Sequence, residues 1–185
     1  MRATTVHLLP RSGWAEDAHP ERCGQDEPAA TAGERRPGTL TAMALVGEYE
    51  PSTVAWVREE VEHLERTGTG LRGRRVVLLT TVGARSGLLR KTPLMRVEHA
   101  GVYAAVASTR GGDRNPHWYA NALAHPEVEL RDGDEHLSLV AREATGEERS
   151  RWWSLACTRF PSYVEYQRRT GRRIPVLLLE PPAGH

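Results

Sequence analysis

The segment Thr80-Thr-Val-Gly-Ala-Arg-Ser-Gly87 decides the fold, because an apolar run enters it and an alternating run leaves it. Four apolar residues, Val76 to Leu79, come before the segment, and Arg90-Lys-Thr-Pro-Leu94 comes after it. A short apolar run that ends in turn residues is typical of a buried strand. Gly83 and Gly87 allow the chain to reverse direction. The segment therefore predicts two consecutive strands joined by a tight turn.

The same turn carries groups that favour an anion. Backbone N–H groups beside glycines can converge on one negatively charged atom, and the hydroxyl of Ser86 adds a donor. Arg85 and Arg90 add permanently charged, forked donors suited to phosphate or carboxylate. No acidic residue lies between Glu65 and Glu98, whereas eight basic residues do: Arg66, Arg72, Arg74, Arg75, Arg85, Arg90, Lys91 and Arg96. A tight hairpin on a solvated basic face is the alternative. Nucleic-acid binding is less favoured, because the interleaved aromatic residues of a single-strand platform are absent.

Outward from this turn, the sequence predicts about six strands and four helices. Apolar and alternating runs bounded by turn residues predict strands at Val76–Thr81, Thr92–Glu98, Val102–Ala107, Val128–Arg131, His136–Arg142 and Ile174–Glu180. Helical spacing and start signals predict helices from Pro51 to near Gly68, from Asn115 to Ala124, from Thr145, and from Ser162 to near Gly171. Thr145 with Glu148, and Ser162 with Glu165, have the spacing of a capping box. Mostly consecutive strands indicate an α+β domain with an antiparallel sheet or barrel.

The chain divides into two parts by composition. Residues 1–42 hold scattered Pro, Gly, Glu and Arg without strand or helix periodicity, which predicts a disordered tail or a start site misassigned upstream of Met43. Residues 43–185 form the predicted domain. The net charge is +1, and Cys23 and Cys157 lie far apart, so no disulfide framework is expected. With neither a signal peptide nor a spanning segment in evidence, the expected location is the cytoplasm.

Several motif classes are excluded by context. Gly68-Thr-Gly-Leu-Arg-Gly73 matches the dinucleotide-binding pattern, but it follows a predicted helix and precedes a predicted strand, the reverse of the required order. The eight histidines never fall at metal-ligand spacing, so no metal site is expected. No serine lies in the G-x-S-x-G turn of a hydrolase.

Two further segments combine aromatic and polar residues. Ser108 lies where a strand runs into a glycine-rich turn, and Trp118 and Asn121 share a face of the next helix. Tyr163 and Tyr166 share a face of the last helix, and a tyrosine hydroxyl can donate a proton. Taken alone, the Trp118 and tyrosine patterns are more typical of packing than of a site.

Together, the three segments resemble the deazaflavin-dependent nitroreductase family, from about Val46 to Pro181. The resemblance rests on four matches: Thr80-Thr-x-Gly-x-x-Ser-Gly87, Arg90-x-Thr-Pro-Leu94, Asn115-Pro-x-Trp-Tyr119 with Asn121, and Pro161-Ser-Tyr-x-x-Tyr-Gln167. It implies a split β-barrel of the flavin-reductase and pyridoxamine-phosphate-oxidase type. It also implies coenzyme F420, an 8-hydroxy-5-deazaflavin with a polyanionic tail, as hydride donor to a quinone, nitroaromatic or other activated acceptor.

The resemblance also assigns roles to residues. It implies Tyr163 and Ser108 as the catalytic residues, and Phe160 and Tyr166 as the substrate pocket. The implied coenzyme contacts are Gly83, Ala84, Arg85, Ser86, Gly87, Arg90, Lys91, Thr92, Pro93, Leu94, Met95, Val106, Ala107, Ser108, Thr109, His117, Trp118, Tyr119, Ala120, Asn121 and Tyr163. Three positions depart from common family residues: Ala84 replaces one member of a basic pair, Thr109 replaces a frequent lysine, and Phe160 replaces a tyrosine.

Two alternatives stay open at this point. One is a reductase that uses flavin mononucleotide (FMN) on the same barrel, and the other is a non-catalytic protein that carries the coenzyme. The expected partner is a small-molecule hydride acceptor rather than a nucleic acid. Peripheral contact with the inner face of a membrane would give access to lipid quinones.

Overall fold

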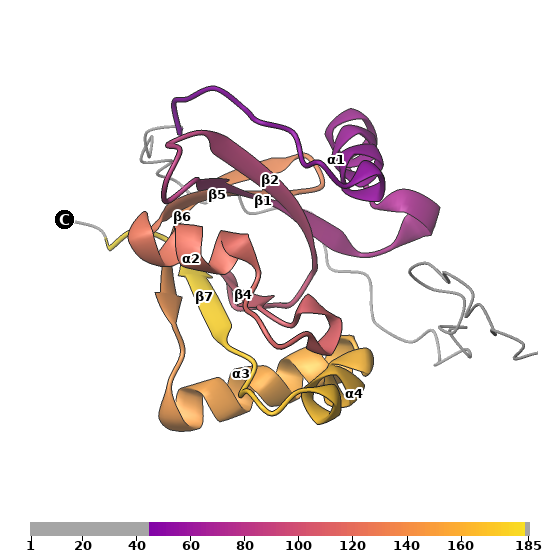
Figure 1. The fold of residues 1–185 in the computed structure, drawn as a ribbon, viewed down its shortest axis with the longest axis vertical. Coiled ribbons are helices and arrows are strands. Elements are labelled where there is room, and N and C mark those ends of the chain that lie inside the picture. Colours follow the sequence, from indigo (N-terminus) through magenta and orange to yellow (C-terminus); the bar gives the residue numbers. More distant parts are fainter. Residues whose placement is uncertain (1–44, 184–185) are drawn as a thin grey trace, which may run out of the picture. The chain divides into compact units, whose positions relative to one another are not determined.

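A computed structural model describes residues 45–183, so the predicted tail at 1–42 lies outside the described residues. Figure 1 shows the fold, in which helices flank a curled antiparallel sheet. The elements are α1 (Ala55–Thr67), η1 (Leu71–Gly73), β1 (Val76–Val82), β2 (Leu89–Met95), β3 (Glu98–His99), β4 (Val102–Val106), η2 (Thr109–Gly111), α2 (His117–Ala124), β5 (Glu127–Asp132), β6 (Glu135–Glu143), α3 (Gly146–Arg159), α4 (Ser162–Arg169) and β7 (Val176–Glu180).

The predicted first pair of strands is present, with a different boundary. β1 and β2 are antiparallel, and their register runs from Val76 opposite Met95 to Val82 opposite Leu89. The second strand thus begins at Leu89 rather than Thr92, because the residues after the turn already pair with the end of β1. It also ends sooner than predicted, at Met95, and Glu98 begins a separate strand. The sheet therefore contains seven strands rather than six.

The order of the strands explains how the sheet closes into a barrel. The order is β2-β1-β5-β6-β7-β4-β3, so the two edge strands are β2 and β3, which are consecutive in the chain. Only Arg96 and Val97 separate these strands, and the backbone oxygen of Val97 accepts a hydrogen bond from the N–H of Ala104 at 2.8 Å. One bent segment therefore joins both edges of the sheet. The α+β split-barrel fold expected from the sequence is confirmed.

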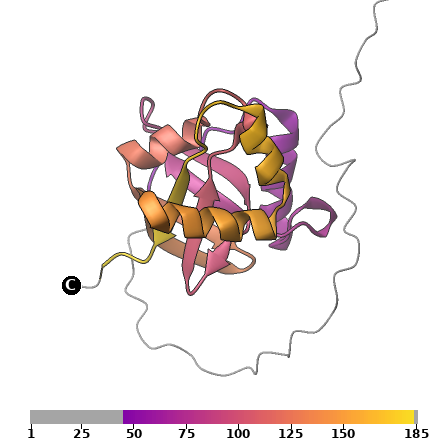
Figure 2. The same ribbon diagram turned by 90° about the horizontal axis from the view of Figure 1, so that it is seen from below.

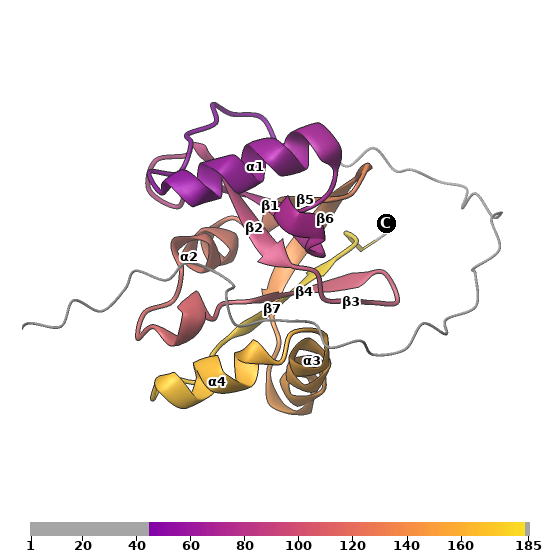
Figure 3. The same cartoon turned by 90° about the vertical axis from the view of Figure 1, so that its right-hand side faces the viewer.

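Each face of the curled sheet has its own apolar core. The inner core gathers buried residues of five strands around Trp118 and Ala122 of α2: Val77, Leu79, Tyr103, Ala105, Ala107, Val128, Leu130, Leu139, Ala141, Leu177 and Leu179. On the outside, α1 packs Val61 and Leu64 against β1. Elsewhere on the outer face, α3 and α4 cover β4 and β7. These helices lie at opposite sides of the barrel: Figure 3 shows α1 at one side and α3 with α4 at the other. Figure 2 shows α3 and α4 crossing each other.

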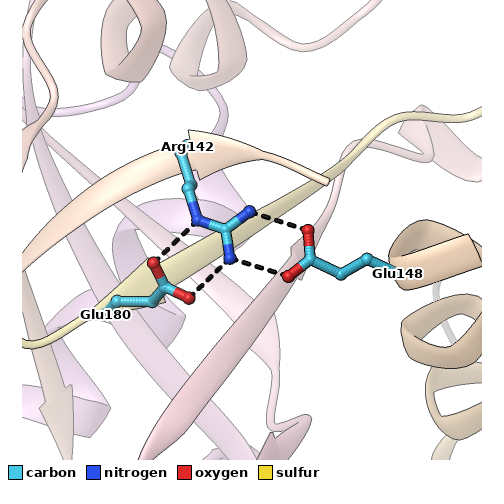
Figure 4. A network of polar contacts seen from close by, with 3 residues as sticks. All are labelled: Arg142, Glu148 and Glu180. Carbon is cyan, nitrogen blue, oxygen red and sulfur yellow. Dashed lines mark hydrogen bonds and ion pairs between the residues drawn. The ribbon is translucent and has the colours of Figure 1, made fainter. Parts of the chain in front are cut away.

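The predicted helix starts differ in detail: α1 begins at Ala55 rather than Pro51, and neither predicted capping box is formed. Thr145 is the N-cap of α3, but its side chain makes no capping bond, and the carboxylate of Glu148, the other half of the predicted capping box, binds Arg142 instead. Figure 4 shows the guanidinium of Arg142 on β6 held between the carboxylates of Glu148 and Glu180, each at 2.7 Å. This network ties the start of α3 to β6 and β7. Ser162 is the first residue of α4 rather than its cap, a position taken by Pro161.

No helix among residues 45–183 is both long and apolar enough to cross a membrane.

Candidate functional site

The three predicted segments leave the barrel at the same end. Four antiparallel pairings lead from β1 through β5, β6 and β7 to β4, so β1 and β4 run in the same direction. The turn after β1 and the Ser108 loop after β4 therefore start at one end of the barrel. The connection from α4 enters β7 at that end too, because β7 runs opposite to β4. Residues far apart in sequence are thereby gathered into one region.

The turn of residues 83–87 has a backbone that requires glycine. The N–H of Gly83 donates to the oxygen of Leu88, and the N–H of Gly87 donates to the oxygen of Gly83, both at 2.8 Å. A Cβ atom at position 83 would lie 2.6 Å from the Oγ of Ser86 and 3.1 Å from the backbone oxygen of Leu88, so a side chain there would displace Ser86 and crowd the turn. Gly87 has a φ of +69°, in the left-handed region that glycine adopts readily.

This turn leaves donors facing solvent. Among residues 45–183, the backbone N–H groups of Arg85 and Ser86 find no acceptor, and the exposed guanidinium of Arg85 pairs with no carboxylate. The Oγ of Ser86 accepts from the N–H of Leu88 at 3.3 Å, so its own O–H is free to donate. Two amides, a hydroxyl and a guanidinium in one exposed turn could form a cradle for an anion.

Asn121 on α2 fixes the position of this cradle. Its Oδ1 accepts a hydrogen bond from the N–H of Ala84 at 3.0 Å, and its Nδ2 donates to the Oγ1 of Thr81 at 3.3 Å. Asn121 is buried, so both ends of its amide are used inside the protein. Its indicated role is to support the turn, whereas the resemblance implied a direct coenzyme contact.

The other predicted residues of α2 differ in exposure. Trp118 is buried in the inner core, whereas His117 and Ala120 are exposed. The hydroxyl of Tyr119 donates to the Oε2 of Glu143 at 2.7 Å. Burial is the main cause that raises the pKa of Tyr119 to about 12, and this hydrogen bond is the second cause.

The predicted residues of β2 divide between two faces. Leu94 packs against the inner core, whereas Met95 packs against both outer clusters. Successive strand residues point to opposite faces, so Arg90 and Thr92 share the side of Leu94, and Lys91 and Pro93 share the side of Met95.

The two cations of β2 already have partners. Arg90 forms an ion pair with Glu50, and Lys91 pairs with Glu65 on α1 while lying over the ring of Tyr49. Arg85 is therefore the cation of this region that is most available to an external anion.

The loop after β4 is strained. Val106 faces the outer cluster and Ala107 the inner core, and Ser108 follows where the strand ends. Thr109 and Arg110 then have φ values of 44° and 52°, which are unfavourable for residues with a Cβ, and most of all for β-branched threonine. Sites held in such conformations are often functional.

The loop packs tightly against α4. A Cβ at Gly111 would lie 2.7 Å from the backbone oxygen of Tyr166 and 2.8 Å from the Cβ of Arg169. Only glycine therefore allows η2 to approach the helix this closely. The contact brings the Ser108 loop beside the helix that carries the predicted tyrosines.

The aromatic residues of the last segment form one cluster. The ring of Phe160 lies 5.1 Å from that of Tyr163, and Tyr166 lies 6.2 Å from both. The Tyr163 side chain is only 5% exposed, and burial is the main cause that raises its pKa above the usual value of tyrosine. Its hydroxyl makes no hydrogen bond to any of residues 45–183 and is not fully enclosed, so it remains able to donate.

The sequence interpretation missed two residues near this cluster, Trp56 and Arg172. Arg110 places its guanidinium carbon 5.5 Å from the centre of the Trp56 ring on α1. Burial lowers the pKa of Arg110, and the proximity of Tyr166 opposes that shift. Arg110 thus lies over Trp56 and next to Gly111, which packs against the backbone of Tyr166, and it brings the start of α1 to the site. No motif marks Trp56. The available signal in the sequence is a tryptophan near the start of a predicted helix, and in the structure this residue is exposed.

The second missed residue is Arg172, whose guanidinium binds the Ser108 loop at several points. Its neighbours in sequence gave no indication of this contact. Within the part of the chain that the structure describes, no group of His, Cys, Asp and Glu could hold a metal ion.

Comparisons with known proteins agree on one family. The model of the F420H(2)-dependent quinone reductase family matches residues 53–181. The F420H(2)-dependent quinone reductase Rv1261c of Mycobacterium tuberculosis is 34% identical over 106 residues, which are 56% of this chain and 71% of that protein. A solved F420-H2 dependent reductase, FDR-A, is 52% identical, with 58% of this chain and 95% of that chain covered and a TM-score of 0.55. A structure described as a domain-swapped dimer is 49% identical, with 70% and 100% covered and a TM-score of 0.57.

Proposed function

Because the chain belongs to the F420H(2)-dependent quinone reductase family, we propose that the site at this end of the barrel transfers a hydride from reduced coenzyme F420 to a quinone. The protein is an oxidoreductase with coenzyme F420 as its cofactor, as the sequence indicated. FMN is the less favoured cofactor. The assignment of particular residues rests chiefly on the solvent-facing donors of the turn at residues 83–87.

The turn fits the anionic tail of the coenzyme. Two free backbone N–H groups, the hydroxyl of Ser86 and the guanidinium of Arg85 would hold its phosphate or carboxylates. Gly83 and Gly87 leave room for this approach, and Asn121 keeps the turn in place. Arg90 contributes charge from β2, although Glu50 neutralises part of it.

The ring would lie between the Ser108 loop and the start of α2. When bound, the reduced deazaflavin supplies a hydride, and the protein contributes position and electrostatics. Both flanking segments belong to the same end of the barrel as the anion cradle. Val106, Ala107 and Trp118 are buried and serve as a rigid base, while Ser108 and His117 are accessible.

Tyr163 is the proposed proton donor. A reduced quinone gains negative charge on oxygen, and a nearby hydroxyl can stabilise or protonate that oxygen. Burial raises the pKa of Tyr163, so its phenol stays protonated at neutral pH. Phe160 has no proton to give and shapes the pocket beside Tyr163. Ser108 would orient the acceptor from the facing loop.

Trp56, Arg110 and Tyr166 form the proposed wall for the acceptor. Arg110 lies 5.5 Å from the centre of the Trp56 ring, and the adjacent Gly111 packs on the backbone of Tyr166, so a flat quinone could pack on an aromatic surface beside a positive charge. A fixed cation aimed at developing negative charge lowers the barrier of such reactions. This arrangement favours a quinone over an aliphatic acceptor.

Peripheral membrane contact is a further part of the proposal for a lipid-soluble quinone. Val54 and Trp56, at the start of α1, are 45% and 38% exposed, and apolar and tryptophan side chains suit a lipid interface. Co-sedimentation with anionic vesicles should decrease in Val54→Ser if this end of α1 touches lipid. Equal binding of both proteins would contradict the contact.

The central experiment measures hydride transfer directly. Reduced F420 is mixed with the full chain and a soluble menaquinone analogue, and oxidation of the coenzyme is followed by its absorbance. Saturable oxidation that depends on enzyme is expected. Titration with FMN in place of F420 tests the alternative cofactor. Tight F420 binding without oxidation by any quinone or nitroimidazole would instead support the non-catalytic carrier.

A further inference from the structure

Arg172 lies in the short connection between α4 and β7, yet it binds the loop after β4. Its guanidinium makes four hydrogen bonds to that loop: Nε to the oxygen of Gly112 at 2.8 Å, Nη1 to the Oδ1 of Asn115 at 2.6 Å, and Nη2 to the oxygens of Ala107 at 2.9 Å and Ser108 at 3.1 Å. The sequence predicted a helix starting at Asn115, but α2 starts at His117 with Pro116 as its N-cap, and the side chain of Asn115 binds Arg172 instead.

These acceptors flank the strained turn on both sides. Ala107 and Ser108 precede Thr109 and Arg110, whereas Gly112 follows them. A backbone in an unfavourable region persists only if its surroundings fix it. One planar group that binds the carbonyls before and after the turn supplies this restraint.

The backbone at Arg172 is anchored to α4. Gln167 donates from Nε2 to the backbone oxygen of Arg172 at 2.7 Å and accepts at Oε1 from the N–H of Ile174 at 2.9 Å. Thr170 donates to the Oδ1 of Asp113 at 3.2 Å, which adds a second link to the loop. Figure 3 shows the segment between β4 and α2 beside α4.

We propose that Arg172 is a positioning residue that locks the strained turn against α4 and so sets Ser108 and Arg110 relative to Tyr163 and Tyr166. The consequence for catalysis rests on the proposed function, whereas the restraint on the loop does not. Asn115 and Gln167, two residues of the sequence motifs without an assigned role, are its supports. An arginine is required because its planar fork offers five donors, whereas a lysine ammonium offers three from a single point.

The experiment compares Arg172→Gln and Arg172→Lys with Arg173→Gln in the full chain. Arg173 is the matched control, because it is the adjacent, exposed arginine and makes no hydrogen bond to residues 45–183. Hydrogen–deuterium exchange of the loop is the first readout. The N–H groups of Gly111 and Gly112 bind the oxygens of Ser108 and Thr109 in the turn. Their exchange should rise about tenfold or more in both Arg172 variants, without faster exchange in β1 and β5.

Kinetics are the second readout. Turnover with a quinone should fall about tenfold, and affinity for F420 should fall less than turnover, because the anion cradle is on a separate turn and only the proposed ring position borders the loosened loop. Lysine should rescue little, since the role depends on the fork. Wild-type loop exchange in Arg172→Gln, or full rescue by lysine, would overturn the proposal.

Further controls separate the possible failures. If Arg172→Gln does not fold, Asn115→Leu removes one of the four contacts and should show the same pattern at smaller amplitude; wild-type exchange there would contradict the restraint. Faster loop exchange with unchanged turnover would overturn the link to catalysis. Failure of the wild-type protein to oxidise reduced F420 would refute the proposed function, while the exchange result would still decide the restraint.

Discussion

Asn121 accepts a hydrogen bond from the backbone N–H of Ala84 at 3.0 Å, across 37 residues of sequence. This contact couples α2, which flanks the proposed ring position, to the turn that offers donors to an anion. A change in Asn121 is therefore expected to affect coenzyme binding through the turn.

The first prediction tests this coupling with Asn121→Ala and Thr81→Val. Asn121→Ala removes the acceptor of Ala84, and one hydrogen bond of about 1 kcal/mol corresponds to roughly fivefold weaker F420 binding. Thr81→Val removes only the other partner of Asn121, so it should lower stability but leave coenzyme affinity closer to that of the wild type. Titration calorimetry and thermal unfolding measure the two effects. If both variants bind F420 with equal affinity, the hydrogen bond from Ala84 to Asn121 does not contribute to coenzyme binding.

The second prediction concerns Arg85. Arg85→Ala should weaken F420 binding about tenfold, because a charge-assisted contact is worth about 1.5–3 kcal/mol and solvent screens part of it. The loss should shrink as salt concentration rises. Arg75→Ala is the matched control: it is also exposed, but it lies before β1, at the opposite end of that strand from the turn. A similar loss in both variants would point to a general effect of charge.

The third prediction concerns the proton. Tyr163→Phe should bind F420 normally but lose about 10²- to 10⁴-fold in turnover, the usual scale for a positioned acid. Because burial raises the pKa of Tyr163, its proton is retained until the pH exceeds the usual value for tyrosine, about 10. Turnover should therefore show no loss attributable to Tyr163 between about pH 6 and 9. An alkaline decline within this range that disappears in Tyr163→Phe would contradict the argument. Unchanged turnover in Tyr163→Phe would leave Tyr163 as packing.

The fourth prediction concerns Trp56. Trp56→Leu removes the aromatic surface beside Arg110, so the KM for quinones should rise about three- to tenfold, from the loss of about 1 kcal/mol of ring packing. The KM for F420 serves as internal control and should not change. Steady-state kinetics with several quinones measure both constants. If the KM for F420 rises instead, Trp56 belongs to the coenzyme site.

The fifth prediction concerns stability. Arg142→Gln breaks the network with Glu148 and Glu180 shown in Figure 4, and should lower the free energy of unfolding by about 1 kcal/mol or less, because these side chains are exposed. Hydrogen bonding to Arg142 lowers the pKa of Glu148, so this contribution is present above the usual pKa of a glutamate and is lost as the pH falls. The difference between the two proteins should thus disappear in acid, as measured by urea unfolding at several pH values. A constant difference down to about pH 3 would contradict this origin.

The elements and the turn follow largely from local sequence. The apolar run from Val76 predicted a buried strand, and six of the seven residues of β1 are buried. Gly83 and Gly87 predicted the reversal, because a side chain at Gly83 would crowd the turn and Gly87 adopts a left-handed backbone conformation. The strands predicted at Val128–Arg131 and His136–Arg142 also followed, since they correspond to β5 and β6, which pair across a two-residue turn between Asp132 and Glu135. These features depend on neighbours along the chain, so the sequence shows them directly.

The tertiary structure alone decided which side chains meet. Nothing near Arg90 indicated that Glu50 would neutralise it, and nothing near Arg172 indicated that it would bind Ala107, 65 residues away. Such pairs depend on strand register and on the closure of the barrel by one bent segment, which local periodicity does not encode. The sequence could thus establish the kinds of chemical groups available at the site. Their division between free donors, internal supports and occupied charges was set by long-range packing.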